Sequence, residues 1–97
     1  MTLSAAARSD VKAPYSGRVE FAGPFKEYQT LVIVNVGEGY FLLLAGLSNT
    51  IVDVGDQLSK GDIVGTLPAS RQGQSELYIE LRKNGGPINP RPWFGDF

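Results

Sequence analysis

The chain has 97 residues, which is enough for one domain with a single modest core. Its formal net charge is −1 with no run of like charges, so neither nucleic acid nor an anionic membrane is indicated as a partner. The absence of cysteine and histidine excludes disulfides, thiolate chemistry and imidazole ligands within this chain, and its short apolar stretches do not predict insertion into a membrane.

The first ten residues are small and polar, and we expect them to form a flexible segment ahead of a domain that spans residues 11–97. Residues 1–7 show neither the basic start nor the apolar core of a secretory signal. From Val11 onward no segment has ten or more residues of helical period, so the pattern is β.

The predicted strands are short runs of β-branched and apolar residues, separated by glycine-containing turns. They cover residues 17–21, 30–36, 40–45, 50–54, 61–67 and 76–82. A Gly37-Glu38-Gly39 turn joins the second run to the third and predicts a hairpin there. The sequence therefore predicts an all-β domain of about seven short strands, either a small sandwich or a partly open barrel.

Two turns of similar sequence, Gly55-Asp56 and Gly61-Asp62, lie six residues apart. Each glycine permits a positive φ between short strands. This hammerhead-like pattern, together with Ala13-Pro14-Tyr15-Ser16-Gly17-Arg18-Val19 ahead of it, is similar to segments shared by LytM domains and by biotinyl or lipoyl carriers. The pattern favours an architecture more than an activity.

The last predicted strand resembles that of LytM (lysostaphin-type) endopeptidase domains. In active members this strand reads His-x-His, and here the same two positions are Glu76 and Tyr78. A further histidine of the family, which assists catalysis, corresponds to Gly46. The resemblance implies a degenerate LytM domain from which the zinc chemistry has been lost, and the first strands of the full domain are not evident in this sequence.

Two enzymatic or cofactor-dependent alternatives are disfavoured by the residues present. A carrier domain needs a lysine at a hairpin tip, usually flanked by methionines, but Met1 is the only methionine and Lys60 lies inside the Gly-Asp repeat. A zinc endopeptidase of peptidoglycan needs three protein ligands, and Glu76 alone cannot supply them. We therefore expect no cofactor, no metal and no catalytic residue.

The C-terminal tail, Gly86-Pro87-Ile88-Asn89-Pro90-Arg91-Pro92-Trp93-Phe94, is similar to that of EnvC-type murein hydrolase activators, which also carry tyrosine at the position of Tyr78. This resemblance covers about residues 11–94. It implies a periplasmic, catalytically inactive protein that docks an N-acetylmuramoyl-L-alanine amidase in the vacated groove during cell-wall remodelling and daughter-cell separation. Peptidoglycan would lie nearby, and self-association stays open because a second copy could supply strands.

The predicted groove follows from the two-residue period of a strand. Glu76, Tyr78, Glu80 and Arg82 alternate onto one face, where the imidazoles of an active member would stand. Tyrosine offers an amphipathic anchor and arginine a forked donor, both common at binding hot spots. Tyr28 resembles a tyrosine that rims the family's groove and Leu31 begins the adjoining strand, although ordinary edge packing explains these two equally well. The predicted partner-binding residues are Tyr28, Leu31, Gly46, Glu76, Tyr78 and Arg82.

Overall fold

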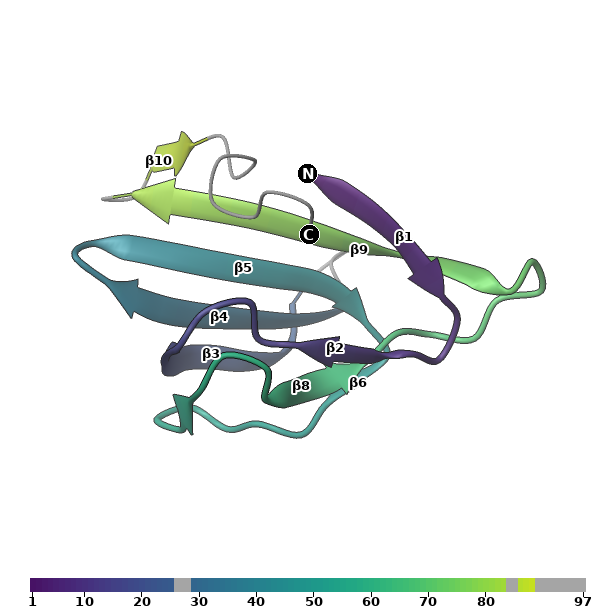
Figure 1. Ribbon diagram of the computed structural model, residues 1–97, viewed down its shortest axis with the longest axis horizontal. Helices are drawn as coiled ribbons and strands as arrows, with labels where there is room; N and C mark the ends of the chain where they lie inside the picture. The colour runs from purple at the N-terminus through teal and green to yellow at the C-terminus, as the bar shows by residue number, and fades with distance from the viewer. Residues whose placement is uncertain (26–28, 84–85, 89–97) are drawn as a thin grey trace.

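The structure is a computed structural model that describes residues 1–25, 29–83 and 86–88. These residues form two antiparallel sheets (Figure 1). The strands are β1 (Thr2–Ala6), β2 (Asp10–Lys12), β3 (Gly17–Pro24), β4 (Thr30–Gly37), β5 (Tyr40–Leu47), β6 (Asn49–Thr50), β7 (Gln57–Leu58), β8 (Ile63–Thr66), β9 (Gln74–Lys83) and β10 (Gly86–Ile88). In the described part of the chain, no helix is long and apolar enough to cross a membrane.

The large sheet has seven strands in the order β1-β9-β5-β4-β3-β7, with β10 also paired to β9. The small sheet has the order β2-β8-β6. The long strands β3, β4 and β5 form consecutive hairpins, and β9 returns from the far end of the chain to pair with β5 (Figure 1). The sheets stay open at their edges, so the fold is a sandwich rather than a closed barrel.

The predicted hairpin between β4 and β5 is confirmed. Gly37, Glu38 and Gly39 all have positive φ, at 99°, 56° and 82°. The side-chain oxygen Oδ1 of Asn35 accepts a hydrogen bond of 2.9 Å from the Gly37 N–H and closes the end of β4. Glycine at two of the three positions with positive φ lowers the backbone strain of this tight turn.

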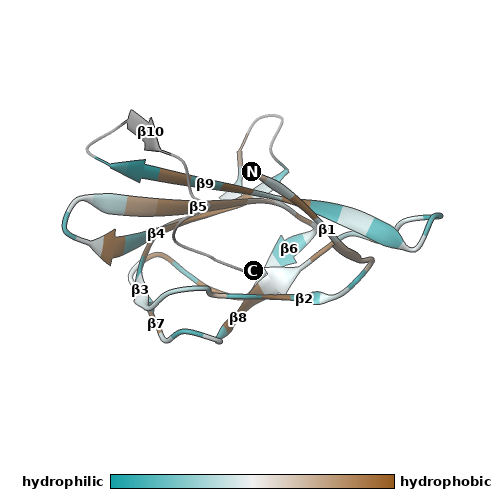
Figure 2. Ribbon diagram, turned by 45° about the horizontal axis from the view of Figure 1, so that its top comes forward, coloured by the Kyte–Doolittle hydropathy of each residue, from teal (hydrophilic) through white to brown (hydrophobic). Residues whose placement is uncertain are grey.

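The core lies between the two sheets, and each long strand of the large sheet turns one face toward it. Figure 2 shows hydrophobic stretches along β4, β5 and β8, with hydrophilic turns at the ends of strands. The largest fully buried side chains come from both sheets, and they are Leu42, Leu44, Leu47, Ile79, Leu81, Val19, Val32, Val34 and Val64.

The two Gly-Asp turns have the same geometry, as their similar sequences indicate. The Asp56 carboxylate accepts a 2.8 Å bond from the Asp53 N–H, and the Asp62 carboxylate accepts one of 2.8 Å from the Ser59 N–H. Gly55 and Gly61 have φ of 95° and 94°. Each turn therefore combines an aspartate that satisfies a free backbone donor with a glycine that reverses the chain.

These turns also fasten the loops to the sandwich. Ala13 donates to the Asp62 carbonyl at 2.7 Å and accepts from the Gly61 N–H at 2.8 Å. Val19 makes the equivalent pair of bonds to Asp56 and Gly55, at 2.9 and 2.8 Å. Two equivalent pairs of backbone hydrogen bonds therefore connect residues 13–19 to the two Gly-Asp turns.

The structure differs from the predicted strands at several ends. β1 lies within the segment expected to be flexible, and β2 precedes the first predicted strand. The sequence of β1 has weak local β propensity, and its strand geometry comes from pairing along β9, from Thr2 opposite Tyr78 to Ala6 opposite Gln74. The strand expected over residues 50–54 is reduced to β6, and residues 51–54 form the approach to the first Gly-Asp turn.

We expect Gly65→Ala to destabilise the domain strongly. A Cβ at Gly65, which is buried in β8, would lie 2.2 Å from the Asn49 carbonyl oxygen in β6. The strands would have to separate, and we expect the free energy of unfolding to fall by more than about 2 kcal/mol, or roughly 8 °C or more in Tm. Thermal melts followed by circular dichroism measure this.

Gly55→Ala is the matched control. Its φ is strained for alanine, but a Cβ there would meet nothing within 4 Å. The expected loss is about 1 kcal/mol, from backbone conformation alone. Equal Tm values for the two variants would contradict the close approach of β6 and β8.

Candidate functional site

The residues of β9 alternate strictly between the core and the opposite face. Leu77, Ile79 and Leu81 are buried, with relative exposures of 6%, 0% and 0%. Glu76 is exposed, whereas Tyr78, Glu80 and Arg82 are half-buried on the other side of the strand; we call these four residues the polar row. The predicted shared face is therefore confirmed.

The neighbouring strands place apolar side chains beside the polar row. Ala45, Leu43 and Phe41 of β5 lie directly opposite Tyr78, Glu80 and Arg82 of β9. Residues that face each other across an antiparallel pair share one side of the sheet. The large sheet therefore has an outer face on which the polar row borders an apolar surface.

The apolar surface continues over β4 and β3 and is hollowed next to Arg82. Ile33 lies opposite Leu43, and Phe21 lies opposite Ile33. One hollow of about 360 Å³ and an adjoining one of about 240 Å³ share the side chains of Phe21, Ile33, Leu43 and Arg82. We call this pair of depressions the apolar hollow.

Aromatic rings form one wall of the apolar hollow. The rings of Phe21 and Phe25 meet edge to face, with centroids 5.8 Å apart and planes at 80°. Phe25 remains 39% exposed. An exposed phenylalanine next to half-buried aliphatic side chains is a surface that gains free energy when a partner covers it.

Within the polar row, one carboxylate connects two neighbours. The Tyr78 hydroxyl donates to Oε2 of Glu80 at 3.4 Å, and Nε of Arg82 donates to Oε1 at 3.2 Å. A second guanidinium nitrogen of Arg82 lies 3.1 Å from the same Oε1. Tyrosine, glutamate and arginine therefore form a connected network along the edge of the apolar hollow.

Gly46 and Glu76 come together at the other end of the polar row. Gly46 belongs to β5 and has a φ of 92°. A Cβ built on it would lie 3.0 Å from the backbone oxygen of Glu76, so β5 and β9 approach closely at this point. A side chain at position 46 would need the neighbouring backbone to shift by a few tenths of an ångström, and the positive φ disfavours residues other than glycine.

Of the two remaining predicted residues, the structure describes only Leu31. Leu31 is 4% exposed and lines the smaller depression together with Arg82. Tyr28 lies outside the described residues. The sequence analysis missed Phe21, Ile33 and Leu43, although a β5 sequence that is apolar on both faces is the signal that could have found the apolar surface.

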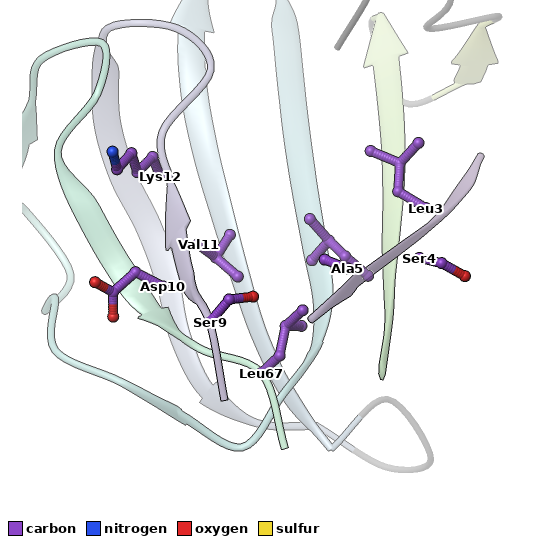
Figure 3. Close-up of a pocket in the computed structure, with 9 residues that line it drawn as sticks. Leu3, Ser4, Ala5, Ser9, Asp10, Val11, Lys12 and Leu67 are labelled. Atoms are coloured by element: carbon purple, nitrogen blue, oxygen red, sulfur yellow. The ribbon is translucent and has the colours of Figure 1, made fainter. Parts of the chain in front are cut away.

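A separate hollow of about 310 Å³ lies between β1 and β2. Figure 3 shows the side chains of Ala5, Val11 and Leu67 gathered around it, whereas Ser4 and Asp10 point away. The Ser9 hydroxyl, which also lines it, donates to the Ala6 carbonyl at 2.6 Å. Most of the side chains that line this hollow are apolar or small, and we propose no function for it.

The fold and the outer face define the class of the protein, a LytM-type β domain whose last long strand carries a polar row. The chain belongs to peptidase family M23, because the sequence model of that family matches residues 1–90. The chain is 34% identical over 96 residues to the murein hydrolase activator EnvC of Escherichia coli strain K12, a match that covers 98% of this chain. It spans 23% of the length of that relative.

Solved structures have the same fold. The catalytic domain of the prophage-encoded M23 protein EnpA from Enterococcus faecalis, as an A109H mutant, matches with a TM-score of 0.81 and 25% identity over 97% of this chain and 76% of that one. A chain of the SpoIIIAH and SpoIIQ complex matches with a TM-score of 0.76 and 26% identity over 87% of this chain and 61% of that one. The fold is therefore found both in a catalytic domain and in a protein–protein complex.

The residues at the family's histidine positions do not fit a zinc ion. Gly46 has no side chain, the Tyr78 hydroxyl is directed to Glu80, and Glu76 is one carboxylate where catalytic zinc needs three protein ligands. Among the residues that the structure describes, no group of three histidine, cysteine, aspartate or glutamate side chains could hold a metal ion.

We accordingly expect the chain to bind no stoichiometric zinc. Elemental analysis of protein purified without chelator, dialysed against micromolar zinc and desalted, measures this. Much less than one zinc per chain is expected, because carboxylates scattered over a surface bind zinc weakly. One zinc per chain that survives desalting would contradict the assignment of Glu76, Tyr78 and Gly46.

Proposed function

We propose that this chain is a non-enzymatic binding domain that activates peptidoglycan amidases during cell-wall remodelling and daughter-cell separation in the periplasm. The observation that carries the proposal is the outer face, where a tyrosine–glutamate–arginine network borders the apolar hollow and occupies the family's ligand strand. The similarity to EnvC, a murein hydrolase activator, supports the same role.

The proposed partner is an N-acetylmuramoyl-L-alanine amidase, docked on the outer face. The composition of this face supports a protein partner: tyrosine, arginine and phenylalanine are enriched in interface centres. Arg82 keeps 41% of its side chain exposed, so it can contact a partner while it pairs with Glu80. Phe21, Ile33 and Leu43 offer apolar area that a docked segment would remove from water.

The second candidate function is peptidoglycan endopeptidase activity, which the EnpA catalytic domain favours as a relative of the same fold. Hydrolysis in this family would need a metal-bound water and a base. Among the described residues, no group of three histidine, cysteine, aspartate or glutamate side chains could hold such a metal, and the sequence contains no histidine.

The two functions predict different results with purified sacculi. We expect the chain alone to release no peptidoglycan fragments, with or without added zinc, because the polar row does not supply the three protein ligands that a catalytic zinc needs. Chromatography of the soluble products measures this. Fragment release that persists after removal of contaminating hydrolases, and that a chelator abolishes, would favour the endopeptidase.

The docking surface is tested by truncating the polar row. Tyr78→Ala and Arg82→Ala are each expected to weaken amidase binding about thirtyfold, since loss of a hot-spot side chain costs about 2 kcal/mol. Both side chains lie on the outer face and not in the core, so each variant should still fold, which thermal melts check. Calorimetric titration against candidate amidases from the same organism measures the affinity.

Lys60→Ala is the control for this titration. Lys60 is exposed in the second Gly-Asp turn, away from the outer face, and its loss should leave the affinity within error. If both polar-row variants bind as tightly as the wild type, the amidase does not dock on this face.

A further inference from the structure

We propose that Glu80 is a positioning residue of the outer face, whose carboxylate fixes Tyr78 and Arg82 in the arrangement that a partner meets. This inference rests on the proposed function, since it concerns the same surface. Glu80 would act through its neighbours, and the partner would contact the tyrosine and the arginine.

The two carboxylate oxygens of Glu80 bind different neighbours. Oε1 accepts from Nε of Arg82 at 3.2 Å and lies 3.1 Å from a second guanidinium nitrogen. Oε2 accepts from the Tyr78 hydroxyl at 3.4 Å. Because the three residues alternate along β9, this single side chain reaches its neighbours on both sides.

Glu80, the proposed anchor, is more buried than Arg82, the residue that would contact the partner. The Glu80 side chain is 13% exposed, whereas that of Arg82 is 41% exposed. Leu43 lies directly opposite Glu80 in β5, so the carboxylate sits against apolar surface. A carboxylate in such a place is held by its donors, and the more exposed guanidinium extends from it toward solvent.

The geometry also limits how Arg82 can grip a partner. The edge of the guanidinium that carries Nε already faces Glu80, which leaves the rest of the planar group for a partner. Arginine can serve both sides at once because it has five donors, whereas lysine has a single ammonium group. The Arg82→Lys variant should therefore lose either the anchor or the partner contact.

Without Glu80, Arg82 would have to be ordered when the partner binds, and Tyr78 would lose its bond to the carboxylate. Ordering a side chain with many rotamers costs about 0.5–1.5 kcal/mol, so losing the anchor of Arg82 weakens binding by up to about tenfold. Glu80→Ala is thus expected to bind an amidase up to about tenfold more weakly than the wild type. Glu80→Gln keeps the size and an acceptor oxygen, and should stay within about threefold.

A double-mutant cycle separates positioning from a general structural effect. In an Arg82→Ala background, Glu80→Ala should add less than about threefold, because only Tyr78 is left to be held. The full 97-residue chain is titrated against purified amidase, with thermal melts of every variant. An unchanged or tighter complex for Glu80→Ala, or the same loss in both backgrounds, would overturn the proposal.

A measurement on the free chain tests the inference without any partner. In NMR spectra, the Nε–H signal of Arg82 should be resolved and protected from exchange in the wild type and in Glu80→Gln, and should become exchange-broadened in Glu80→Ala. An unchanged signal in Glu80→Ala would overturn the positioning role. If no amidase binds the wild type while the Arg82 signal behaves as expected, the proposed partner is wrong and the positioning stands.

Discussion

The structure depends on the two-residue alternation of β9 and on its pairing at both edges. β5 pairs along one edge, and β1 and β10 share the other. Leu77, Ile79 and Leu81 fill the core from one side of this strand, so the polar row must stand on the other. A slip of one residue would bury carboxylates and expose leucines. The constraint that stabilises the sandwich is therefore the one that aims the proposed binding residues.

The outer face combines an apolar hollow with a hydrogen-bonded polar network. Covering the apolar hollow and the exposed Phe25 removes apolar area from water, which is favourable. The adjacent polar network offers hydrogen bonds that would orient a bound partner. Glu80 offsets the charge of Arg82, so the face is not strongly basic, and the proposed partner would be selected by shape and hydrogen bonding more than by long-range attraction. These features support the proposed docking site.

Much of this arrangement is predictable from local sequence. The alternation of apolar and polar residues predicts the two faces of β9. Glycines at positive φ mark the Gly37-Glu38-Gly39 hairpin and the two Gly-Asp turns. β1 escaped prediction because its small residues have no local preference, and only the distant β9 makes them a strand. The apolar hollow escaped as well, since Leu43 and Leu44 look alike in sequence while one faces outward and the other the core. The role of Glu80 depends on side-chain torsions that no pattern specifies.

The most direct test of the central claim measures amidase activation. Dye-labelled peptidoglycan is incubated with an autoinhibited N-acetylmuramoyl-L-alanine amidase, with the 97-residue chain, or with both. The account predicts slow dye release by the amidase, none by the chain, and much faster release by the mixture, saturating as the chain is titrated. Release from the mixture that equals the sum of the separate reactions would contradict it.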